Sequence, residues 1–169
     1  LEFRRVLFRS SLPKFLIPVD NKLFRGGAIC TPKKFRQLKE NNVSQIIDLR
    51  HAPSITKSIE EFMCKIFGIK YVNQKYSHKL STLPENKFFK EITQQIEQNP
   101  QKTYIHCEYG KRRTGVVVAY YEKEKGVKSP KTILDEMLQL GFYDLENSGK
   151  RIERYKKILA QFKAKYFPE

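Results

Sequence analysis

The stretch HCEYGKRRTG, from His106 to Gly115, constrains this chain more than any other. The residues Thr103–His106 predict a β-strand that ends just before Cys107, and a helix is expected to begin near Arg113. The loop between them is long enough to turn its successive backbone N–H groups toward one point. Because the loop leads into the positive end of a helix dipole, the sequence predicts an anion-binding site.

Two side chains of this loop suit phosphate chemistry. Arg113 offers a planar fork of donors, which fits bidentate binding of phosphate oxygens. The same positive field favours a thiolate at Cys107, so we expect the pKa of this thiol to lie below the ordinary value of about 8.5. The spacing Cys-x5-Arg therefore predicts one loop that binds a phosphate dianion and holds a nucleophile beneath it.

These residues resemble the signature loop of the cysteine-dependent phosphatases, the protein-tyrosine and dual-specificity superfamily. The resemblance implies that Cys107 forms a phosphocysteine and that Arg113 binds the phosphoryl oxygens. It also implies that Thr114 hydrogen-bonds the leaving thiolate, and that His106 fixes the loop and the pKa of the cysteine. The rest of the loop is expected to bind phosphate through its backbone and its basic side chains: Glu108, Tyr109, Gly110, Lys111 and Arg112.

Strand and helix patterns alternate along the rest of the chain. Strands are expected within 15–27 (one or two short edge strands), at 43–49, 69–72 and 103–106, and helices at 32–41, 54–67, 84–98, 113–126, 129–141 and 148–166. This alternation is typical of an α/β fold, with a mainly parallel sheet and helices on both faces. Cys107 then lies at the carboxyl end of a strand, where such sheets bind ligands.

The resemblance extends beyond the loop. The order FRGG, helix, IIDLR resembles the first part of the dual-specificity phosphatases, especially the atypical group from plants, fungi and bacteria. It spans roughly residues 23–141 and implies a phosphotyrosine-phosphatase-like fold. Within it, Asp48 of IIDLR is expected to be structural.

Length and composition predict one domain without a membrane span. The chain has 169 residues, 40% of them hydrophobic, and no apolar run approaches the length of about 18 that a span needs. Residues 1–10, LEFRRVLFRS, match a translated sequencing adapter, so we expect a non-native leader at 1–10 and a single phosphatase domain at 11–169. The true N-terminus is then missing, which leaves a targeting signal open. Three cysteines argue for a reducing compartment, and we expect a cytoplasmic protein.

The chain is strongly basic, with 33 Lys and Arg residues against 18 acidic ones and a formal net charge of +15. This charge points to anionic partners, namely a phosphorylated protein or a polyanionic phosphate ester. Nucleic acid is not favoured, because the basic residues are spread along the whole chain and no nucleic-acid motif is present. We expect a monomer.

The general acid is the weakest part of the sequence pattern. Aspartate, which these phosphatases commonly use to protonate the leaving oxygen, is missing from the stretch 73–86. Glu85 is the nearest carboxylate, although an acid at a helix start also complements the helix dipole. His78 is the other titratable candidate. A third alternative is a chain without a general acid, which would act on good leaving groups.

Three functions stay open. The resemblance favours hydrolysis of phosphotyrosine or phosphoserine and phosphothreonine in proteins. The loop places Lys111 directly after its glycine and Arg112 next, and this order instead resembles the loops of enzymes that act on inositol polyphosphates or phosphoinositides. Both side chains would equally suit a solvent edge. Glu108 argues against this substrate. A phosphate-binding module without turnover is the third.

No cofactor or metal is expected. Nothing in the sequence has metal-ligand spacing, and the phosphocysteine route needs no metal. His51 is expected to be a turn residue. Cys64 is expected in the core, on the apolar face of a helix marked by Ile59, Phe62, Met63 and Ile66, whereas Cys30 precedes a helix start and is expected to be partly reactive.

Overall fold

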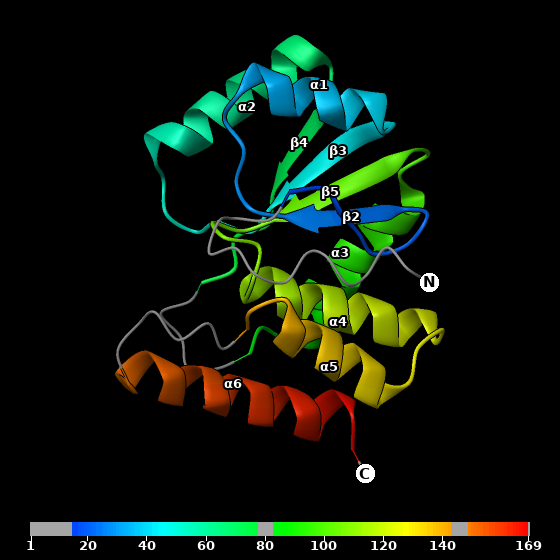
Figure 1. Cartoon of the computed structure of the whole chain (residues 1–169), viewed down its shortest axis with the longest axis vertical. Helices are drawn as coiled ribbons and strands as arrows, with labels where there is room; N and C mark the ends of the chain where they lie inside the picture. Colours follow the sequence, from blue (N-terminus) through cyan, green and yellow to red (C-terminus); the bar gives the residue numbers. More distant parts are fainter. Residues whose placement is uncertain (1–14, 78–82, 143–148, 169) are drawn as a thin grey trace.

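The computed structural model describes residues 15–77, 83–142 and 149–168, in which strands and helices alternate (Figure 1). The predicted leader at 1–10 and His78 lie outside these ranges. The strands are β1 (Ile17–Pro18), β2 (Leu23–Gly26), β3 (Val43–Asp48), β4 (Lys70–Asn73) and β5 (Lys102–His106). The helices are α1 (Pro32–Glu40), α2 (Ile55–Phe67), α3 (Asn86–Gln98), α4 (Arg113–Lys125), α5 (Pro130–Gln139) and α6 (Gly149–Tyr166). Among the residues so described, no helix is both long and apolar enough to cross a membrane.

The strands form one sheet in the order β1-β2-β5-β3-β4. All neighbouring strands are parallel except β1 and β2, which form an antiparallel edge. The predicted α/β fold with a mainly parallel sheet is therefore confirmed. In the register, His106 lies between Gly26 of β2 and Asp48 of β3, so three strands end side by side where Cys107 follows.

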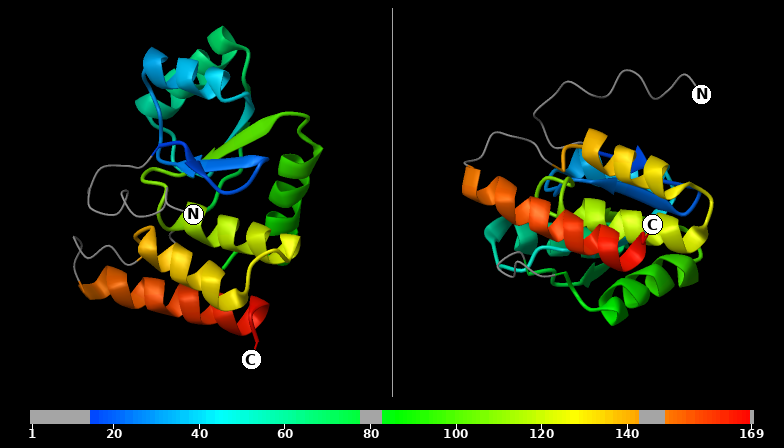
Figure 2. Two further views of the ribbon diagram at one scale, coloured as in Figure 1. Left: turned by 45° about the vertical axis from the view of Figure 1, so that its right-hand side comes forward. Right: turned by 90° about the horizontal axis from the view of Figure 1, so that it is seen from below.

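Helices cover both faces of the sheet, as predicted. Helices α1 and α2 lie on one face, and α3 and α4 lie on the other (Figures 1 and 2). Helices α5 and α6 form a further layer beyond α4. The first part of α6 lies beside the loop after β5, where Arg112 contacts Tyr155.

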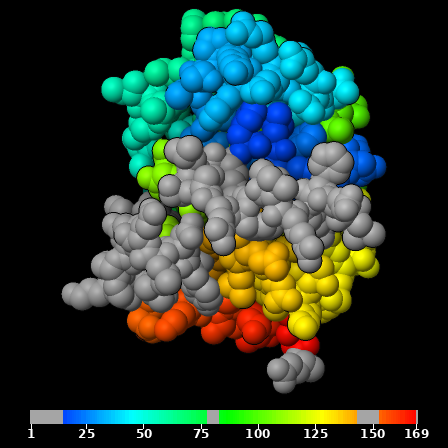
Figure 3. Space-filling view, viewed as in Figure 1, coloured from blue at the N-terminus to red at the C-terminus, as the bar shows by residue number. Residues whose placement is uncertain are grey.

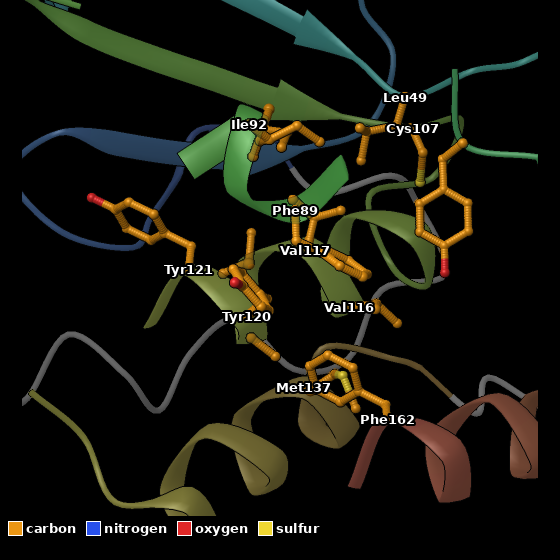
Figure 4. Packing of buried hydrophobic residues seen from close by; sticks show 14 of the residues in the cluster. Leu49, Phe89, Ile92, Cys107, Val116, Val117, Tyr120, Tyr121, Met137 and Phe162 are labelled. Atoms are coloured by element: carbon orange, nitrogen blue, oxygen red, sulfur yellow. The ribbon is translucent and has the colours of Figure 1, made fainter. Parts of the chain in front are cut away.

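Each face of the sheet has its own hydrophobic core. On the α1 and α2 side, Phe35 and Leu38 pack against the sheet residues Ile46 and Tyr104. On the other side, aromatic rings join the helices: Phe89 of α3 stacks on Tyr120 of α4 at 5.0 Å and contacts Phe162 of α6 (Figure 4). Burial of these large side chains fixes β5 and α4, which carry the ends of the loop.

Three predicted helix ends are confirmed, namely the starts of α2 and α5 and the end of α2. Ser54 and Ser129 cap α2 and α5, each accepting a hydrogen bond from a backbone N–H three residues on, at 3.2 Å. Gly68 ends α2 in the left-handed conformation, with φ 62°. Helix α3 begins at Asn86, two residues after its predicted start, and Glu85 is its N-cap without a side-chain hydrogen bond.

Helix α2 is present where it was predicted, but the apolar spacing does not mark its buried face. Phe62 and Ile66 are 62% and 61% exposed, whereas Cys64 is buried as expected. The residue that shares the buried face with Cys64 is Glu60, which is fully buried. A buried carboxylate is stable here because it pairs with two cationic side chains, Arg50 and His106, and these ion pairs orient the helix.

Candidate active site

The loop from Cys107 to Arg112 joins β5 to α4 and is held from below by the segment after β2. Gly110 has φ +69°, and a Cβ atom at this position would lie 2.2 Å from the carbonyl oxygen of Gly26. The close approach and the left-handed backbone both require glycine at this position. The carbonyl of Gly110 accepts a hydrogen bond from the buried Arg25 at 2.8 Å, and the carbonyl of Glu108 accepts one from the N–H of Ala28 at 3.0 Å.

Cys107 lies buried at the base of this loop, beside Leu49 (Figure 4). Burial by itself would raise the pKa of its thiol. The charge of Arg113, the hydroxyl of Thr114 and the backbone N–H groups of Thr114 and Gly110 outweigh burial, so the pKa of Cys107 is held below its ordinary value. The loop therefore favours a thiolate, as the sequence predicted.

Two arginines place positive charge near the sulfur. Arg113 begins α4, and its Nη1 donates to the carbonyl oxygen of Leu49 at 3.3 Å, which directs its guanidinium toward the loop. Arg25 reaches the loop from β2, and burial lowers its pKa to about 10 although the charge of Cys107 opposes this. Arg25 thus stays cationic near neutral pH while it supports the loop carbonyl.

A buried ion-pair network lies behind the loop. Glu60 places Oε1 2.6 Å from Nε2 of His106 and accepts a hydrogen bond from Nη2 of Arg50 at 2.5 Å. Arg50 also donates to both carboxylate oxygens of Asp48, which accepts a further hydrogen bond from Tyr71 at 2.6 Å. The other ring nitrogen of His106 lies 3.0 Å from the carbonyl oxygen of Cys107. The network connects β3, α2 and β5 directly beneath Cys107.

The network holds Asp48, Arg50 and His106 in their charged forms. Burial alone would lower the pKa of His106, but Glu60, together with Asp48, raises it to about 9. Burial would likewise raise the pKa of Asp48, yet the hydrogen bonds from Arg50 hold it below its ordinary value. At neutral pH Arg50 and His106 are therefore cations and Asp48 is a carboxylate.

Three residues of this network, Asp48, Glu60 and His106, are close enough together to bind one metal ion. Their potential ligand atoms lie within 4.8 Å of one another. Arg50, however, donates to both carboxylates. Its guanidinium and the imidazolium of His106 already balance the two negative charges. Among the described residues the geometry therefore favours an ion-pair cluster over a metal centre.

A pocket of about 510 Å³ opens above the loop. Its walls come from three parts of the chain: the loop itself, the segment after β3 and the first part of α6. They include the loop side chains Cys107, Glu108, Tyr109, Lys111, Arg112 and Arg113, the segment residues Arg50, His51, Ala52 and Ser54, and Arg154 and Tyr155 of α6. Basic side chains predominate, so the pocket suits a phosphate group.

The structure brings most of the predicted site residues together but not the predicted acid. Glu85 is exposed at the start of α3 and does not line the pocket, and His78 lies outside the described residues. Among the described residues that line the pocket, Glu108 is the one carboxylate, beside five Lys and Arg side chains. Its Oε2 lies 3.9 Å from Nη1 of Arg50. The acid role of Glu85 stays a prediction.

The structure adds residues that sequence reasoning missed. Arg25 supports the loop through a hydrogen bond. It is the arginine of the FRGG motif, so the sequence contained a pattern that could have identified it. Glu60 has no local signal, because its partners lie on other elements. Arg154 lines the pocket from a helix whose basic residues resemble an ordinary solvated face. Arg112, in turn, places its guanidinium 4.3 Å from the ring centre of Tyr155, so this loop arginine is anchored against α6.

Comparison with known sequences agrees with this geometry. The sequence profile of the tyrosine phosphatase family matches residues 19–160, which is most of the chain. No curated protein matches the sequence significantly.

Solved structures with the same fold include three phosphatases. The core catalytic domain of the PP-IP phosphatase SIW14 from S. cerevisiae is 18% identical, with a TM-score of 0.65 over 91% of this chain and 93% of that one. TpbA from P. aeruginosa is 13% identical, with a TM-score of 0.64 over 86% and 81%. Tk-PTP is 16% identical, with a TM-score of 0.58 over 90% and 97%. At these identities the likeness establishes the fold.

Proposed function

The chain belongs to the tyrosine phosphatase family, and we propose that it hydrolyses phosphate monoesters with Cys107 as the nucleophile. The observation that carries this proposal is the position of Cys107. Its sulfur lies at the base of a loop whose N–H groups and Arg113 lower the pKa of the thiol. A thiolate and a phosphate-binding loop in one place are what transfer of a phosphoryl group to sulfur requires.

In the first step the Cys107 thiolate attacks the phosphorus, and the bond from phosphorus to the ester oxygen breaks. The leaving oxygen takes the electron pair and a proton from solvent or from a general acid, and the phosphoryl group stays on sulfur as a phosphocysteine. Arg113 and the loop N–H groups stabilise the negative charge on the phosphoryl oxygens during the transfer.

In the second step water attacks the phosphorus, and the bond from phosphorus to sulfur breaks. Inorganic phosphate leaves, and the thiolate is restored with its electron pair. The interactions that lower the pKa of Cys107, including the hydroxyl of Thr114, make sulfur a better leaving group in this step. Glu60 and His106 hold the carbonyl of Cys107 and so act as positioning residues.

The decisive experiment traps the intermediate. Wild-type protein mixed with para-nitrophenyl phosphate and quenched rapidly should contain phosphocysteine at Cys107. Cys107→Ser should bind substrate but release no nitrophenol, whereas Cys30→Ser, which changes an exposed cysteine outside the pocket, should keep full activity. Turnover by Cys107→Ser at the wild-type rate would overturn the mechanism, and binding without turnover by the wild type would indicate a phosphate-binding module.

For the substrate, we infer a phosphorylated protein. Tyr109 is 57% exposed at the pocket, where an aromatic side chain suits contact with a peptide or a phosphotyrosine ring. The related fold of TpbA has been solved in complex with pTyr. A side-by-side assay of phosphotyrosine peptide, phosphothreonine peptide, inositol polyphosphates and phosphoinositides tests this inference, and faster turnover of the last two would contradict it.

A second candidate is a polyanionic phosphate ester. It is favoured by Arg154, which adds a basic side chain from α6 to the pocket that already contains Lys111 and Arg112. The fold neighbour SIW14 is named a PP-IP phosphatase. Against this candidate, Arg112 is engaged with Tyr155 and Glu108 contributes negative charge to the same wall.

We also infer a monomer that acts in the cytoplasm. The three free cysteines support the cytoplasmic location, because reducing compartments keep thiols free. Light scattering coupled to size-exclusion chromatography tests the monomer, and a mass of twice the chain would contradict it.

A further inference from the structure

Exposed apolar side chains gather on one helix. Seven large hydrophobic residues among those described are exposed, and four of them lie on α2. A fifth, Tyr109, lines the pocket. The four on α2, which we call the α2 stripe, are Ile55 (80% exposed), Ile59 (40%), Phe62 (62%) and Ile66 (61%). Contiguous apolar patches on a protein surface mark interaction sites, whereas single exposed residues are ordinary.

The α2 stripe is continuous. Its residues are spaced four, three and four positions apart, so they lie on one face of the helix. They extend over about 16 Å at the helical rise of 1.5 Å per residue. The inward face is defined by Glu60 and Cys64, which are buried. Figures 1 and 3 show α2, in teal, at the outer edge of the molecule.

The stripe begins where the pocket ends. Ser54, the N-cap of α2, lines the pocket together with His51 and Ala52. Ile55 is the next residue along the chain and is the most exposed member of the stripe. A ligand that leaves the pocket in this direction therefore meets the α2 stripe at once. The N-terminal end of the α2 stripe thus lies one residue along the chain from the lining of the pocket.

We propose that the α2 stripe binds an apolar segment of the phosphoprotein substrate, next to the phosphorylated residue in the pocket. This inference rests on the proposed function. A basic pocket followed by an apolar surface matches a partner that has a phosphate and, beside it, apolar side chains. The charges along the flank of the stripe, Glu61 and Lys65, form an ion pair with each other. The stripe itself therefore has no cationic side chain that would bind a polyanion. Its occupant is a peptide with apolar residues at the spacing of an amphipathic helix.

Two phosphotyrosine peptides of equal length and charge test this proposal. The first continues on both sides of the phosphotyrosine into leucines at amphipathic-helix spacing, and the second has glutamine in place of each leucine. Wild-type protein should show a KM about tenfold lower for the leucine peptide, as truncation of good apolar anchors typically changes affinity by this factor. The double variant Phe62→Gln with Ile66→Gln, which removes half of the stripe, should reduce the difference, and an unchanged difference would contradict the proposal. Both positions face away from Glu60, and glutamine keeps the helix propensity.

The matched control is Val127→Gln, which removes a side chain that is 81% exposed outside α2 and the pocket. It should keep the preference for the leucine peptide. Para-nitrophenyl phosphate, which is too small to reach the stripe, should be hydrolysed equally by all three proteins, and no turnover of it at all would contradict the proposed function instead. Equal KM values of the wild type for the two peptides would overturn the docking proposal. So would a dimer that the double variant converts to a monomer, because a second copy would then cover the stripe.

Discussion

Oε1 of Glu60 lies 2.6 Å from Nε2 of His106, and both side chains are fully buried. The pair connects α2 to the residue immediately before Cys107. Through its other oxygen Glu60 also accepts from Arg50, whose Nη1 lies 3.9 Å from Glu108 in the loop. One carboxylate therefore links the position of α2 to both His106 and, through Arg50, the outer part of the loop.

This pair predicts a specific dependence of stability on pH. The folded protein holds a proton on His106 up to a pKa of about 9, whereas the unfolded chain releases it near 6.5. Between these values the folded state binds more protons, so the free energy of unfolding should fall as pH rises, by on the order of 1–3 kcal/mol. Urea unfolding at pH 6 to 9.5 measures this. The work is best done in Cys107→Ser, because the thiolate would contribute a slope of opposite sign.

Glu60→Gln provides the comparison. The amide cannot stabilise an imidazolium, so the fall in stability between pH 6.5 and 9 should flatten in this variant. The variant should also be less stable throughout, by about 3–5 kcal/mol, since Arg50 loses a buried partner. The same slope in both proteins would show that His106 is not held protonated by Glu60.

Gly110→Ala should remove activity while leaving most of the fold. A Cβ atom there would lie 2.2 Å from the carbonyl oxygen of Gly26, and φ is +69°, so the loop must shift. A shift of about 1 Å at a reacting group typically costs about a hundredfold in rate. Gly68→Ala is the control, because it has nearly the same φ of +62° but open space around it. It should cost about 1–2 kcal/mol of stability without changing kcat, and equal loss of activity in both variants would contradict the steric account.

The loop was predictable because its determinants are contiguous in the sequence. Strand, cysteine, glycine, arginine and helix start follow one another within one short stretch, and local patterns specify each of them. Helix ends at Ser54, Gly68 and Ser129 were predictable for the same reason, since a cap depends on neighbouring backbone.

The orientation of α2 was not predictable from its apolar spacing. Periodicity assumes that the apolar face is the buried face, but Glu60 is drawn inward by Arg50 and His106. These partners lie on separate elements and meet only in the folded chain. The position of Arg154 at the pocket was not predictable for a similar reason, because the approach of α6 to the pocket is a tertiary contact.

The general acid can be tested by the choice of leaving group. Glu85 is exposed and does not line the pocket, so Glu85→Gln should slow aryl and alkyl phosphates by the same small factor. Glu108→Gln is the informative partner, because Glu108 does line the pocket. The measurement is kcat/KM for para-nitrophenyl phosphate and for a phosphoserine peptide. A loss of about 10²–10⁴ confined to the alkyl ester would instead assign the acid to the changed residue, because alkoxides need the proton.

The last prediction concerns the substrate and rests on two basic residues in the wall of the pocket, Lys111 and Arg154. For a phosphoprotein substrate, Lys111→Ala and Arg154→Ala should reduce activity on a phosphotyrosine peptide and on an inositol polyphosphate by the same factor, since both contain one reacting phosphate. Each further phosphate that bound to these side chains would instead add a loss confined to the polyphosphate. Because partly exposed ion pairs contribute about 0.2–1 kcal/mol, that selective loss would be about fivefold per residue at most. The control is Lys163→Ala, which removes a positive charge from α6, the helix of Arg154, at a position outside the pocket. A selective loss with both wall residues, absent from the control, would assign the pocket to polyphosphates.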